Sequence, residues 1–146
     1  MILAEIARQC RFALKAYGAA AAAAARLDDD DLWPAIDALL GAAARLHQLL
    51  WPPREDSAEW PAALRSTLAI GPDSPLHRSE WQAIGDLAAL VDEWSRRPAG
   101  AVRKFDREHA AVRYYGLTFE LAPLLAAIAG LETRAVSEAR QMRQMV

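Results

Sequence analysis

The sequence has a single cysteine, Cys10, and three histidines among its 146 residues. One cysteine excludes an internal disulfide framework and a cysteine-based zinc cluster. Seventeen basic against nineteen acidic side chains give a net charge of -2, which argues against a dedicated nucleic-acid coat. The longest apolar stretch, Ala19 to Ala25, is far shorter than the roughly 20 residues a membrane span needs. These absences predict a cytoplasmic domain that uses no metal and no cofactor and does not enter the membrane.

What the sequence does contain is apolar periodicity of helical type over most of its length. Apolar residues recur every three or four positions in residues 2–27, 36–51, 57–68, 79–94 and 124–136. Alternating character in residues 102–105, 111–115 and 117–121 predicts short strands instead. Residues 1–146 are therefore predicted to form one mainly α domain. Its expected architecture is a single up-down helical bundle of four to five helices, with a small β-hairpin before the last helix.

Residue types at the helix boundaries predict where helices begin and end. The acidic run Asp28 to Asp31 is expected to end the alanine-rich helix, with Asp31 as N-cap of the second helix and Pro34 in its first turn. A divalent-ion site is the alternative interpretation of this run. Ser79, followed three residues later by Gln82, predicts a capping box at the fourth helix. The polar tail from Arg140 onward is expected to fray.

The histidines offer little catalytic chemistry by their spacing. None lies in an H-E-x-x-H or Glu-x-x-His arrangement, so a helical metal site has no ligand pattern. His47, on the second helix, is expected to be a partly buried structural residue, and Cys10 a small buried hydrophobe. Arg103 and His109 could combine a guanidinium for phosphate with an imidazole for proton transfer. The predicted strand and turn between them favour an exposed hairpin instead.

Several stretches resemble a family of small bacterial HEPN-like proteins. They are Ile2 to Gln9 with Phe12 to Leu14, Leu49 to Arg54, Asp73 to Arg78 leading into a helix that ends Asp92-Glu93-Trp94, and Phe105 through Leu125. The resemblance covers most of the chain and implies a compact helical bundle that usually dimerises. Many members of the family are metal-independent endoribonucleases of toxin–antitoxin or phage-defence systems. Their signature is an Arg with a polar neighbour and a His further along the same helix.

This chain departs from the family signature at the positions that would carry the chemistry. Aligning the fourth helix on its Asp92-Glu93-Trp94 ending puts Trp81-Gln82 where the Arg-polar pair is expected and Asp86 where the His is expected. Trp81 removes the cation that would meet a phosphate, and Asp86 adds a charge that repels it. The resemblance therefore implies a degenerate site and a protein that acts through association.

The favoured interpretation is a catalytically degenerate HEPN-like domain, leaning away from an enzyme, that works as a homodimer or in a larger complex of a defence or toxin–antitoxin kind. Trp81 is its best interface candidate. One alternative is a divergent endoribonuclease using Arg78, His77 or His109. Another is a module that binds a nucleotide or RNA without cleaving it, with phosphates held by Arg96, Arg97 and Arg103.

Overall fold

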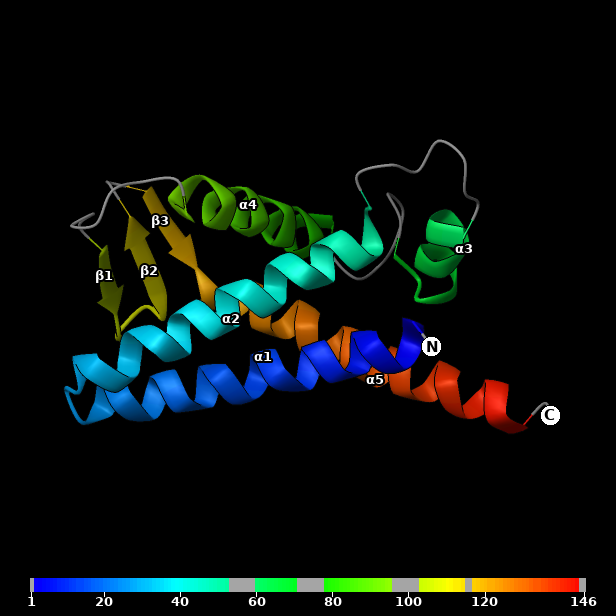
Figure 1. Ribbon diagram of the computed structural model, residues 1–146, viewed down its shortest axis with the longest axis horizontal. Coiled ribbons are helices and arrows are strands. Elements are labelled where there is room, and N and C mark those ends of the chain that lie inside the picture. Colours follow the sequence, from blue (N-terminus) through cyan, green and yellow to red (C-terminus); the bar gives the residue numbers. More distant parts are fainter. Residues whose placement is uncertain (1, 53–59, 71–77, 96–102, 115–116, 145–146) are drawn as a thin grey trace.

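The computed structural model describes residues 2–52, 60–70, 78–95, 103–114 and 117–144. Four long helices in this part of the chain alternate in direction, as Figure 1 shows. This arrangement confirms the predicted mainly α, up-down bundle. Where a small hairpin was expected, three short antiparallel strands precede the last helix. The elements are α1 (Ile2–Ala25), α2 (Asp29–Leu50), α3 (Trp60–Thr67), α4 (Arg78–Ser95), β1 (Arg103–Asp106), β2 (Ala111–Tyr114), β3 (Leu117–Glu120) and α5 (Leu121–Gln144).

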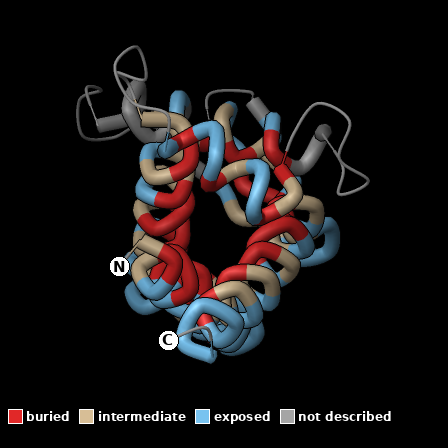
Figure 2. The backbone as a smooth tube through the Cα atoms, turned by 90° about the vertical axis from the view of Figure 1, so that its right-hand side faces the viewer, coloured by how far each residue is buried: buried red, intermediate tan, exposed pale blue. Residues whose placement is uncertain are grey.

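The four long helices close a ring around one hydrophobic core. α1 packs on α2 and α5, and α4 packs on the same two helices from the other side. Seen along the bundle in Figure 2, the buried residues of these helices face a common centre. The core is built from aliphatic side chains of all four helices, and those with no exposed surface include Ile6, Ile36, Leu39, Leu46, Leu50, Ile84, Leu87, Leu124, Ile128 and Leu131.

The sheet has the strand order β1-β2-β3 and joins the bundle through one face. Phe105, Val112 and Phe119 are direct cross-strand partners, and this row packs against the core with Val112 fully buried. The alternate row of Lys104, Arg113 and Thr118 is exposed, as the two-residue period of a strand requires. The backbone N–H of Leu121 donates to the carbonyl of Ala110 at 2.9 Å, which ties the turn between β1 and β2 to the start of α5.

Three residues, Arg26 to Asp28, make the sharp turn from α1 to α2. Leu27 has a φ of 57°, and the N–H of Asp28 donates to the carbonyl of Ala23 at 2.9 Å. With the 3.2 Å bond from the N–H of Leu27 to the carbonyl of Ala24, this is a Schellman motif. The motif satisfies the last carbonyls of α1 and leaves Leu27 86% exposed in a left-handed conformation.

The expected N-cap at Asp31 is wrong, because the tight turn starts α2 earlier. Asp28 has extended backbone angles and is the N-cap, and its side chain accepts from the N–H of Asp31 at 3.3 Å. Asp31 lies in the first turn, 3.6 Å from the guanidinium of Arg26. Pro34 consequently lies in the second turn rather than the first. The N–H that proline lacks there would have bonded to the carbonyl of Asp30.

Two other expected boundaries also differ. α4 already includes Arg78, so Ser79 lies inside the first turn and is not the residue that caps it. α5 continues to Gln144, so the described helix includes the tail from Arg140 to Gln144. The predicted start of α3 at Ser57 lies outside the described residues. No helix in the described ranges is long and apolar enough to cross a membrane.

The left-handed conformation of Leu27 leads to a stability prediction. Leu27→Gly should raise the free energy of unfolding by about 0.5–1 kcal/mol, because glycine adopts positive φ without the clash of a Cβ atom. Part of that relief is offset by the larger backbone entropy of glycine in the unfolded chain. Urea unfolding measures the change. Leu27→Ala keeps the Cβ atom and should give no gain, so equal stabilisation by both variants would contradict the argument.

Candidate functional site

An aromatic cluster formed by His47, Trp51 and Trp81 lies between α2 and α4, the helix that carries the family-signature positions. The rings of His47 and Trp51, both from the C-terminal end of α2, are stacked with centroids 5.3 Å apart and planes at 26°. Trp81, from the first turns of α4, tilts against Trp51 at 6.2 Å and 56°. Such offset and tilted contacts suit the ring quadrupoles and add to the burial of apolar area. The aromatic cluster therefore joins α2 to α4.

Gly85 on α4 leaves room for the imidazole of His47, which extends from α2. A Cβ atom at position 85 would lie 3.3 Å from Nε2 of His47 and 3.6 Å from Cδ2. The imidazole thus sits between the ring of Trp51 and the backbone of α4. It is half-buried, and this burial lowers the pKa of His47 because desolvation disfavours the charged form.

Arg65 on α3 closes one edge of the aromatic cluster. Its guanidinium carbon lies 5.6 Å from the centroid of the Trp51 ring, within the range of a cation–π contact. Its Nη1 donates to the carbonyl of Leu50 at 2.6 Å, at the end of α2 where carbonyls lack helical partners. From the other side, Nη1 of Arg134 on α5 donates to the carbonyl of Leu68 at 3.4 Å. Two arginines therefore hold the short α3 against α2 and α5.

The three degenerate signature positions do not share one surface. Trp81 is 7% exposed and belongs to the core, whereas Gln82 and Asp86 are exposed. Nε2 of Gln82 donates to Oδ1 of Asp86 at 3.1 Å across one helical turn. The sequence-based choice of Trp81 as the best interface residue is not supported by this burial, because the chain itself covers the indole.

The structure gives His109 a setting that differs from the pairing with Arg103. His109 lies in the turn after β1, and its Nδ1 is 3.1 Å from Oδ2 of Asp106. Its backbone N–H also donates to Oδ1 of Asp106 at 3.2 Å. These two bonds, the backbone one first, lower the pKa of Asp106. The arginine near this carboxylate is Arg113, at 3.4 Å, and the imidazole is exposed. Arg103 begins β1 opposite Tyr114.

The remaining predicted site residues are placed only in part. Arg78 is the first residue of α4, and the described structure covers its backbone and not its side chain. His77, Arg96 and Arg97 lie outside the described residues. Within the described ranges, no three His, Cys, Asp or Glu residues are grouped so that they could hold a metal ion.

Cys10 is fully buried, as predicted. Burial raises the pKa of its thiol to about 12. A thiol with this pKa stays protonated at neutral pH and is not a nucleophile. Cys10 therefore contributes packing to the core.

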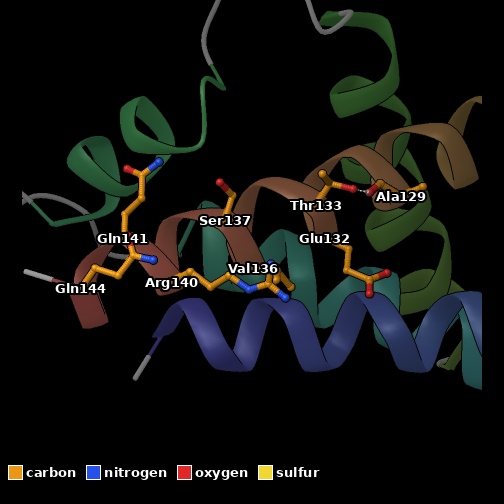
Figure 3. A pocket seen from close by; sticks show the side chains of 8 residues that line it. All are labelled: Ala129, Glu132, Thr133, Val136, Ser137, Arg140, Gln141 and Gln144. Carbon is orange, nitrogen blue, oxygen red and sulfur yellow. Dashed lines mark hydrogen bonds between the residues drawn. The ribbon is translucent and has the colours of Figure 1, made fainter.

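The sequence analysis missed a groove on the outer face of α5, with a volume of about 650 Å³. Figure 3 shows its side chains along the helix, with α1 on one side and α3 and α4 beyond the other. The signal was present in the sequence as small and polar residues beside the apolar stripe of the last helix, and Val136 borders both the core and the groove. The described lining residues are Ala129, Glu132, Thr133, Val136, Ser137, Arg140, Gln141 and Gln144.

No protein-family model, curated protein or solved structure matches this chain.

The contact between Gly85 and His47 predicts opposite effects for the same substitution at two glycines. Gly18 lies on α1, and a Cβ atom added there would meet nothing within 4 Å, so Gly18→Ala should stabilise by about 0.5–1 kcal/mol through helix propensity. Gly85→Ala should destabilise by about 1 kcal/mol, because His47 is held by Trp51 and cannot yield without strain. Thermal or urea unfolding measures both. In a His47→Ala background, Gly85→Ala should become stabilising, and an unchanged penalty there would disprove the contact argument.

The lowered pKa of His47 predicts an acid-sensitive contribution to stability. The folded state binds the proton less tightly than the unfolded state, whose histidine pKa is about 6.5. This contribution is therefore complete above the unfolded pKa and declines as the pH falls below it toward the folded pKa. The free energy of unfolding should fall less between about pH 7 and pH 5 in His47→Gln than in the native protein. Parallel pH profiles for the two proteins would show that His47 titrates alike in both states.

Proposed function

We propose that the protein is a catalytically inactive HEPN-like domain that works in the cytoplasm through association with protein, as a homodimer or within a larger defence or toxin–antitoxin complex. The observation that carries the proposal is the burial of Trp81, which is 7% exposed and packed on Trp51. At the position where the family resemblance implies a phosphate-binding arginine, α4 supplies an indole to the core.

The electrostatics of the same helix support this proposal. One turn beyond Trp81, the exposed Asp86 carboxylate accepts from Gln82, so its charge remains on the surface of α4. A negative charge at this place repels a phosphodiester. Catalysis there would need a compensating cation, and the described side chains of α4 are Trp81 to Ala89, which include none.

Exposed apolar residues supply surface for an association role. Phe12, Trp60 and Met142 are 49%, 46% and 51% exposed, on α1, α3 and α5 respectively. Aromatic residues and methionine are enriched in protein interfaces, where they bring large contact areas. Single exposed apolar residues are also common on monomers, so these three support the proposal only together with the loss of the signature.

A ribonuclease remains a second candidate because of the pair formed by His109 and Asp106. A carboxylate that orients an imidazole is a known arrangement for general acid–base catalysis, and Arg113 could provide a cation beside it. The site is open to solvent, however, and lies on a turn of four residues between β1 and β2. Water exclusion and substrate positioning would have to come from the substrate itself.

The proposal predicts that the purified protein does not cleave total RNA or a tRNA mixture in the presence of a chelator, even at high protein concentration. Gel analysis of the RNA measures this, with His109→Ala as the matched control. Cleavage that persists in chelator and disappears in His109→Ala would overturn the proposal in favour of the ribonuclease. Light scattering on the same protein preparation, measured without RNA, should give a mass above the 16.0 kDa of one chain.

A further inference from the structure

The groove on α5 is a long, shallow surface that a helix can occupy. Its described lining residues run from Ala129 to Gln144, which is about four turns or 22 Å of helix. Small side chains occupy the middle of the surface: Thr133, Val136 and Ser137 lie there, and Ala129 lies at one end (Figure 3). Such side chains let the backbone of a second helix come close to α5.

The charged residues of this surface are separated along the helix. Glu132 lies in its N-terminal half and Arg140 lies eight residues later in its C-terminal half. Two helical turns, about 12 Å, are beyond the three- or four-residue spacing at which side chains on one helix pair with each other. The surface therefore presents a carboxylate and a guanidinium at opposite ends of an uncharged centre.

The lining positions are arranged symmetrically about the midpoint between Val136 and Ser137. Counting outward from that point pairs Val136 with Ser137, Thr133 with Arg140, Glu132 with Gln141, and Ala129 with Gln144. A two-fold axis through the midpoint would place a second α5 antiparallel to the first. The small centre would then meet the same small centre, as an isologous interface requires. Each Glu132 would lie within one residue of the level of Arg140 on the other copy.

We propose that the α5 groove is a two-fold interface that takes α5 of a second copy of this chain, running antiparallel. Charge complementarity favours a second copy and selects its orientation, because an antiparallel copy brings Glu132 to Arg140 twice, whereas a parallel copy brings like charges together. The inference rests on the proposed function and names the surface through which the association takes place. One four-turn helix pair is a small interface, so the dimer is a concentration-dependent one.

Charge reversal tests the interface through the oligomeric state of the full chain. Sedimentation equilibrium of the native protein from about 5 to about 500 µM should show a monomer–dimer equilibrium. Arg140→Glu places four carboxylates in the interface, and Glu132→Arg places four guanidiniums there. Each single variant should raise the dimer Kd at least about tenfold. The double variant exchanges the charges and should return the Kd to within about threefold of the native value.

Two further variants separate the interface from other effects. Lys15→Glu makes the same charge change as Arg140→Glu at an exposed position on α1, and it should leave the Kd unchanged. Ser137→Trp places a large side chain at the exposed centre of the groove and should abolish the dimer while the circular dichroism spectrum stays helical. A dimer that none of the α5 variants weakens would overturn this interface and leave the association proposal standing. A native protein that is monomeric over the whole range would overturn both this interface and the homodimer form of the association proposal.

Discussion

The close packing of α1 between α2 and α5 is the constraint on which the rest of the structure depends. Its buried face consists largely of alanine, with Ala13, Ala20 and Ala23 completely covered, so the neighbouring helices can approach its backbone closely. Larger side chains at these positions would separate the helices and open the ring that α4 completes.

Gln9 lies on the same helix and is 5% exposed. Its Nε2 donates to Glu5, and its Oε1 accepts no hydrogen bond from the described residues. A buried acceptor without a hydrogen bond lowers the stability of the folded state.

The aromatic cluster explains why α4 has the position it has, and it also limits what α4 can do. His47 and Trp51 extend from the end of α2, and Trp81 and Gly85 complete the contact from α4. An indole used in this way holds two helices together and is not presented to a ligand. The helix on which the family resemblance implies catalytic residues is therefore used for packing within the bundle.

α5 has two faces of different character. Leu124, Ile128 and Leu131 fill the core, while small and polar residues on the opposite face line the groove. A helix that buried large side chains on both faces would be part of a larger core. The modest outer face instead suits a contact that forms and dissociates with concentration. A reversible contact also agrees with a net charge of -2, which keeps the repulsion between copies small.

The sequence by itself determined the helices, the short strands and the up-down order, because apolar periodicity and turn residues act within a few positions of one another. It also indicated that Cys10 is buried. The choice of Asp28 rather than Asp31 as N-cap of α2 is also local, since it depends on the Schellman turn at Leu27, but four consecutive aspartates do not show which of them ends that turn. Only the tertiary structure decided the burial of Trp81 and the contact between His47 and Gly85, which lie 38 residues apart in the sequence. Side chains from different helices meet according to how the helices cross, and no local pattern in the sequence records that geometry.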